Sequence, residues 1–190
     1  MAKGQEVTVA KAAVHAGVST ATAYRYYSHP ETLRLEAGLE LDMGPNGDFL
    51  AILDARIDGV VSIPRRVIAA HQIMVEFVRR NEMEYRLFIA KGHEQVVLDH
   101  KPQKSSPRGR RRIPMMQRAV EPVQELLGPE RTKDLVRALM AASGPEPYFV
   151  LTDVGQLPDE DIDRVTEQNL SDIVHAHLTR AGVTGAEWLA

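Results

Sequence analysis

The stretch TVAKAAVHAGVSTATAYRYYSHPETL, residues 8–33, contains two short helical segments on either side of one glycine. Thr8 is placed to cap the first segment and Ser19 the second, because short hydroxyl side chains accept hydrogen bonds from the free N–H groups of a first helical turn. Gly17 lies between them and can adopt the positive φ that a tight turn needs. Four positions earlier, the small residue Ala13 allows two helices to cross closely. The spacing therefore predicts two short helices packed around a glycine turn.

Helical patterns also dominate the rest of the chain. Apolar residues recur every three or four positions between Gly and Pro breaks, and no segment alternates with the period of a strand. Ser28 has the capping-box spacing to Glu31, Gly144-Pro145 predicts a kink, and Gly182 predicts the end of the last helix. We expect an all-α fold with a polar loop at 101–112 and helices at about 8–16, 19–26, 28–44, 50–61, 64–80, 82–99, 114–127, 129–154 and 158–181.

Composition restricts the kind of protein. The chain has 190 residues, of which 44% are hydrophobic and 26% charged, as is ordinary for a soluble globular protein with a sizeable core. It has no cysteine, which excludes disulfides and thiolate metal sites. The N-terminal residues MAKGQE lack the apolar run of a signal peptide, and no apolar run approaches the roughly 18 residues of a membrane span. We expect a soluble, cytoplasmic protein without membrane contact.

Charge is distributed unevenly along the chain. The net charge of −3 gives no overall signature of a nucleic-acid-binding protein. Residues 1–34, however, hold four basic residues against two acidic ones, a balance of +2, which leaves −5 for the remainder. A contact with DNA would therefore have to be local and to lie at the N-terminal end.

The wider string resembles the DNA-binding region of the TetR family of bacterial transcriptional regulators. The matching residues are Thr8-Val9, Ala13, Ala16-Gly17-Val18-Ser19 and Thr22-Ala23-Tyr24-Arg25-Tyr26-Tyr27. Elsewhere the chain matches the family only in the number, length and order of its helices. The resemblance implies an all-helical homodimer with a helix-turn-helix domain at residues 1–45 and a ligand-binding and dimerisation domain at 46–190. It also implies a ligand-responsive regulator, most often a repressor, that binds a pseudo-palindromic double-stranded DNA operator.

The resemblance also suggests how these residues contact DNA. Hydroxyl side chains at helix starts lie where backbone N–H groups attract phosphate. Tyr24 and Arg25, on the second helix, can reach phosphates or base edges in the major groove. Val18 is expected to point into the small core of the pair, whereas Tyr26 and Tyr27 align with aromatic residues that pack the pair onto the next helix. The expected DNA-contacting residues are Thr8, Ser19, Thr20, Thr22, Tyr24, Arg25 and His29.

Three features depart from the family pattern. Ala12 replaces the family's isoleucine, which thins the small core, and Ala21 replaces the family's glycine. Pro30 replaces a lysine at the start of the following helix, so a phosphate contact is either missing or taken over by His29. The family also places a further helix before the motif, where MAKGQEV stands here. Either the natural chain starts upstream of Met1, or this chain carries an incomplete DNA-binding domain.

The larger part of the chain carries candidates for effector binding and dimerisation. Apolar pockets with a few polar groups suit small-molecule effectors, and methionine adapts to varied shapes, although the same residue types also form ordinary cores. The resemblance places a dimer interface on the two long C-terminal helices, at about 131–181, but packing within one chain would give the same apolar stripes. The candidate effector-binding residues are His71, Met74, Phe77, Tyr85, Phe88, Met115, Met116 and Met140.

Other kinds of function find little support in the sequence. It contains no nucleophile elbow, glycine-rich phosphate loop or paired catalytic motif, and its histidines lack convincing metal-ligand spacing. We therefore expect no enzyme, no cofactor and no metal site, and we interpret the basic run at 101–112 as a solvated loop. The alternative to a regulator is a dimeric helical small-molecule-binding protein that has lost specific DNA binding through N-terminal truncation. An all-α enzyme is a more distant alternative.

Overall fold

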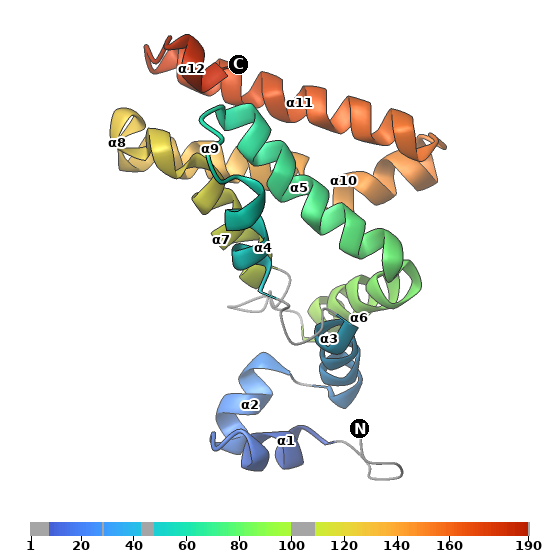
Figure 1. The fold of residues 1–190 in the computed structure, drawn as a ribbon. Helices are drawn as coiled ribbons and strands as arrows, with labels where there is room; N and C mark the ends of the chain where they lie inside the picture. Colours follow the sequence, from blue (N-terminus) through green and yellow to red (C-terminus); the bar gives the residue numbers. More distant parts are fainter. Residues whose placement is uncertain (1–7, 28, 43–47, 100–108, 190) are drawn as a thin grey trace. The chain divides into compact units, whose positions relative to one another are not determined.

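The computed structural model describes residues 8–27, 29–42, 48–99 and 109–189 (Figure 1). Within these ranges all regular structure is helical and no strand occurs, so the predicted all-α fold is confirmed. The chain forms two compact units. Unit 1 comprises Met1–Gly47 and Arg80–Gly109, and unit 2 comprises Asp48–Arg79 and Arg110–Ala190. The division expected from the sequence, 1–45 and 46–190, placed residues 80–109 with the C-terminal part instead.

Unit 1 begins with two short helices, α1 (Val9–His15) and α2 (Thr20–Tyr26). The hydroxyl oxygens of Thr8 and Ser19 each accept a hydrogen bond from the backbone N–H three residues later, at 3.2 and 3.0 Å. Both predicted caps are therefore confirmed. Each supplies a partner to an N–H group that the first helical turn leaves free.

The turn between α1 and α2 depends on Gly17, which has a φ of +67°. The Val18 N–H donates to the carbonyl of Ala13 at 3.0 Å, and the Gly17 N–H donates to that of Val14 at 3.2 Å. These two bonds form a Schellman motif, which needs a left-handed residue at the glycine position. The prediction that glycine takes the positive φ here is confirmed.

The other helices of unit 1 are α3 (Pro30–Asp42) and α6 (Glu82–Asp99), which pack against each other. The Lys91 ammonium on α6 lies 3.1 Å from the Glu31 carboxylate on α3 and 2.9 Å from the Glu94 carboxylate on its own helix. One cation therefore connects the start of α3 to the second half of α6.

Unit 2 is built from the remaining helices, of which α11 is the longest and packs along α9 (Figure 1). They are α4 (Phe49–Arg56), α5 (Ile63–Arg80), α7 (Gly109–Val120), α8 (Gln124–Leu127), α9 (Pro129–Ala142), α10 (Pro145–Phe149), α11 (Asp159–Arg180) and α12 (Ala186–Leu189), with a 3-10 turn η1 (Glu121–Val123) and a π-helical turn η2 (Val150–Val154).

The predicted helix boundaries differ from the structure in four places, one of which is the 3-10 turn η1 inside the segment predicted over 114–127. The segment predicted over 50–61 ends at Arg56, because Gly59 has a φ of +69° and cannot continue the helix. The segment predicted over 129–154 is broken rather than kinked, since Gly144 has a φ of +82°. Helix α7 starts at Gly109, inside the predicted loop. Ser28, the predicted cap of α3, lies outside the described residues.

The contact between α9 and α11 uses the apolar stripes that the sequence displays. Along α11 the buried side chains recur at every fourth position and belong to Ile162, Thr166, Leu170, Val174 and Leu178. On α9 they belong to Leu135, Val136 and Leu139. The two helices pack against each other, and these side chains are buried within one chain.

Candidate functional site

Helix α2 presents most of its side chains to solvent and buries none of those that the structure describes. Tyr24 is 45% exposed, and Thr20 and Arg25 are exposed as well. The Arg25 guanidinium lies 5.2 Å from the centroid of the Tyr26 ring, in cation–π contact. The helix therefore carries a hydroxyl, a phenol and a positive charge on its surface, all of which are suited to phosphates and base edges.

The other hydroxyl groups of this region are engaged in capping. Ser19 Oγ accepts a hydrogen bond from the Thr22 N–H and lies 2.8 Å from Thr22 Oγ1, and Thr8 caps α1. Of the residues predicted to contact DNA, Thr8 and Ser19 therefore cap helices and the Thr22 hydroxyl contacts the Ser19 cap. Ser19 and Thr20 are both exposed.

Two predictions about packing in this pair are wrong. Val18 is 46% exposed and Tyr26 is 37% exposed, although both were expected to be packed. Among their described side chains, α1 and α2 bury only Val9 and Ala13, and Val18 is not buried with them. Tyr27 is half-buried, and its role in packing stays a prediction.

His29 is exposed just before α3, beside a small hollow of about 120 Å³. The hollow is also lined by Glu31, Lys91 and Glu94. Hydrogen bonds to Glu94 and Glu31 raise the pKa of the Lys91 ammonium, which is therefore firmly cationic. A phosphate approaching His29 would meet two carboxylates whose charge is only partly offset by this one ammonium.

Unit 2 contains a pocket of about 800 Å³ between α7, α8 and α9. A volume of this size accommodates a drug-sized molecule. Helix α7 contributes Ile113 and Gln117, and α8 contributes Gln124 and Glu125. The wall formed by α9 consists of residues at helical spacing, namely Pro129, Thr132, Lys133, Val136, Arg137 and Met140.

Only Met140 among the predicted effector-binding residues lines this pocket. In unit 2, all the others are buried: His71, Met74, Phe77, Met115 and Met116. In unit 1, Tyr85 and Phe88 are also buried, and their ring centroids lie 5.9 Å apart in an edge contact. Choosing residues by apolar character selected mostly core positions. The signal that could have found the pocket is the mixture of apolar and cationic residues on one face of α9.

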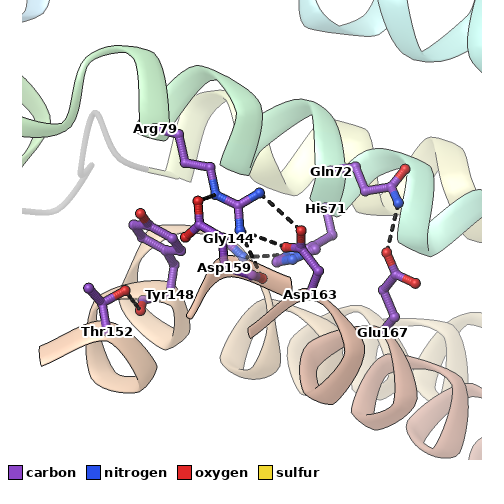
Figure 2. A network of polar contacts seen from close by, with 9 residues as sticks. All are labelled: His71, Gln72, Arg79, Gly144, Tyr148, Thr152, Asp159, Asp163 and Glu167. Atoms are coloured by element: carbon purple, nitrogen blue, oxygen red, sulfur yellow. Dashed lines mark hydrogen bonds and ion pairs between the residues drawn. The ribbon is translucent and has the colours of Figure 1, made fainter. Parts of the chain in front are cut away.

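His71 lies in a polar network that joins α5 to α10 and α11 (Figure 2). Its Nδ1 accepts a hydrogen bond from the Gly144 N–H at 3.2 Å, which places the ring proton on Nε2. In the described structure Nε2 is buried without a hydrogen-bond partner. Burial lowers the pKa of His71 to about 4 and outweighs the nearby Asp163 carboxylate, which raises it. His71 is therefore neutral at neutral pH.

Two further contacts in this network fasten α5 to α11. The Arg79 guanidinium donates to both carboxylate oxygens of Asp163, at 2.8 and 3.1 Å, and lies 5.4 Å from the centroid of the Tyr148 ring (Figure 2). The Gln72 amide donates to Glu167 at 2.7 Å. The bidentate pair of Arg79 and Asp163 combines geometric specificity with strength.

Arg112 belongs to this structural framework and not to a solvated loop. Its side chain is 12% exposed and forms an ion pair with Glu146, while Nη1 donates to the Ser143 carbonyl at 2.8 Å. The guanidinium fills the space where a Cβ at position 144 would lie, with Nη1 2.5 Å from that position. The loop prediction is wrong for this residue, because α7 begins before it.

Within the segment expected to form a dimer interface, 131–181, the large exposed apolar side chains are Val150 and Val154 of the π-helical turn η2. None of the large exposed apolar side chains in the described structure lies on α9 or α11. Val165, Asn169 and Ile173 share one face of α11 by their spacing, and of these Asn169 is exposed and the other two are half-buried. The dimer interface stays a prediction.

Comparison of the chain with protein-family models, with curated proteins and with solved structures found no match in any of the three. In the part of the chain that the structure describes, no helix combines the length and the apolar character needed to cross a membrane. Nor does that part bring together three or more His, Cys, Asp or Glu side chains that could hold a metal ion.

Proposed function

We propose that this protein is a TetR-like, ligand-responsive transcriptional regulator, most simply a repressor, that binds a pseudo-palindromic operator. The observation that carries the proposal is the geometry of α1 and α2. A Schellman turn at Gly17 joins them, Ser19 caps α2, and α2 exposes Tyr24 and Arg25. A helix of this kind fits the major groove, with its first residues near phosphates and base edges. The local charge of +2 over residues 1–34 favours the same partner.

The proposal includes a dimer and an effector. Two copies would place their α2 helices in major grooves about one turn apart or slightly more. We place the dimer interface at about 131–181, on the face of α11 that carries Val165 and Ile173, and the effector in unit 2. Effector binding would favour a spacing that no longer fits the operator, a coupling typically worth about 1–3 kcal/mol.

The test of DNA binding is fluorescence anisotropy with the intergenic DNA beside the protein's own gene. The full chain is titrated at physiological salt against excess non-specific competitor, because phosphate contacts make affinity depend on salt. We expect saturable binding, weakened about tenfold by Tyr24→Ala with little change in Tm, since the side chain is 45% exposed. Arg25→Ala should lower the salt slope by about one phosphate contact. Arg65→Ala removes the same charge from an exposed position on α5 and is the matched control.

The results separate the proposal from its alternative. Equal losses of DNA affinity and thermal stability in Tyr24→Ala would mean that this side chain belongs to the core. Absence of saturable DNA binding, together with retained binding of a small molecule, would favour the ligand-binding protein without specific DNA recognition. Light scattering tests the dimer, which Val165→Lys should convert to a monomer. A monomeric wild-type chain would contradict this part of the proposal.

A further inference from the structure

We infer that the pocket between α7, α8 and α9 binds an amphipathic anion, a molecule with an apolar body and one carboxylate- or sulfonate-type head. The inference names the chemical class of the effector, and so its regulatory meaning rests on the proposed function. Binding itself follows from the composition of the pocket walls.

The apolar part of the pocket explains the apolar body. Val136 and Met140 lie one turn apart on the α9 wall, and Pro129 lies at the start of the same helix. Ile113 on α7 also lines the pocket and is 41% exposed. Val136 is already buried, so an apolar ligand removes hydrocarbon surface from water mainly at Ile113, Pro129 and Met140, and this removal is the main driving force for binding.

The cations of the α9 wall explain the anionic head. Lys133 and Arg137 are separated by one helical turn and therefore lie on the same side of α9. Their partners on the helix are Glu130, 3.8 Å from Lys133 Nζ, and Asp134, 3.4 Å from Arg137 Nη1. Neither of these carboxylates lines the pocket, and all four side chains are largely exposed to water. Ion pairs of this kind contribute little, so the head of a ligand can compete for the two cations.

The remaining polar residues give the ligand a direction. Glu125 on α8 is the one acidic residue that lines the pocket, and it repels an anionic head from that wall. The head is therefore expected at Lys133 and Arg137. A cationic ligand of the same size would meet these two charges and is disfavoured, whereas a neutral one would gain only the apolar contacts.

The test uses two probes and the full-length protein. Binding of 1-anilinonaphthalene-8-sulfonate is followed by its fluorescence, and decanoate and decanol are compared as competitors. We expect saturable binding of one probe per chain, with decanoate displacing it at least tenfold more effectively than decanol. Weaker binding by at least tenfold is expected in the double variant Lys133→Gln/Arg137→Gln, and also in Ile113→Asp, which places a negative charge among the apolar residues.

A matched control separates local from overall charge. Arg65→Gln/Arg131→Gln removes two charges at exposed positions that do not line the pocket, and it should change probe affinity less than twofold. Circular dichroism and Tm establish that each variant is folded. Any of three results would overturn the inference. They are equal probe affinity of the wild type and the Lys133/Arg137 variant, equal competition by decanol and decanoate, and no saturable binding of either anion.

The same experiment distinguishes this inference from the proposed function. Tyr24→Ala should bind the probe like the wild type, because Tyr24 belongs to unit 1 and the pocket to unit 2. Probe binding without operator binding would keep the ligand class and refute the regulator. Operator binding in a protein that binds neither anion, and whose operator affinity neither anion changes, would keep the regulator and refute the ligand class.

Discussion

The stability of unit 2 should depend on pH through one buried histidine. His71 is 2% exposed, and its Nδ1 accepts a hydrogen bond from the Gly144 N–H. A proton added at Nδ1 would therefore point at the Gly144 N–H and break this hydrogen bond. Burial lowers its pKa from 6.5 to about 4. The folded protein therefore binds fewer protons than the unfolded chain between these values, and stability is lost as pH falls from about 6.5 toward 4.

The size of this effect follows from the two pKa values. A difference of about 2.5 pKa units corresponds to about 3 kcal/mol when the pH lies below both values. At pH 5 the unfolded imidazole is almost fully protonated and the folded one almost fully neutral. The His71 contribution lost between pH 7 and pH 5 is then about 2 kcal/mol.

Urea unfolding at pH 7 and pH 5 measures this contribution, with the fluorescence of Trp188 in unit 2 as the signal. The variant His71→Gln keeps a polar side chain but cannot titrate, so its free energy of unfolding should fall about 2 kcal/mol less than that of the wild type between the two pH values. His175→Gln, at an exposed position of α11, controls for the loss of an imidazole. If His71→Gln lost as much stability as the wild type on acidification, His71 would not be the linked group and the reasoning would fail.

Four further substitutions test three glycines and the hydrogen bonds of one arginine. Gly144→Ala should lower the free energy of unfolding by at least about 1–3 kcal/mol, because the residue has a φ of +82° and its Cβ would meet Arg112; urea unfolding measures the loss. Gly17→Ala should destabilise unit 1 by about 1–2 kcal/mol, because Gly17 has a φ of +67°. Gly38→Ala, within α3 and with open space around it, should stabilise that unit by about 0.5–1 kcal/mol. Thermal unfolding monitored by circular dichroism compares the two variants, and equal shifts in Tm would contradict the conformational role of Gly17. Arg66→Met should cost about 2–3 kcal/mol in urea unfolding, since its guanidinium donates to three backbone carbonyls, at 2.9, 3.0 and 3.1 Å; a loss below 0.5 kcal/mol would show that these bonds contribute little.

Local signals in the sequence were sufficient for the turn chemistry. The caps at Thr8 and Ser19 and the turn at Gly17 were predicted because a hydroxyl or a glycine acts on groups within a few residues of itself. The prediction for Arg112 failed because its environment depends on distant residues. Arg112 was assigned to a loop, but its partners at 143 and 146 lie more than thirty residues along the chain.

The candidate site shows the same limit. Apolar character identified Met74, Phe77 and Met115 correctly as residues that avoid water, but it could not separate the walls of a pocket from the interior of a core. That distinction depends on which helices meet and how much space remains between them. The expected burial of Val18 was wrong for a related reason, because only Val9 and Ala13 are buried among the described side chains of α1 and α2.

The sequence by itself determined the helical class, the glycine turn of the N-terminal pair and the caps that start its helices, since these depend on periodicity and on contacts within one or two turns. Tertiary structure alone decided three other features. It packed α9 against α11, buried His71 against the backbone of Gly144, and left a pocket of about 800 Å³ beside Lys133 and Arg137. Burial, pKa and pocket volume depend on residues brought together from distant parts of the chain, and no local pattern encodes them.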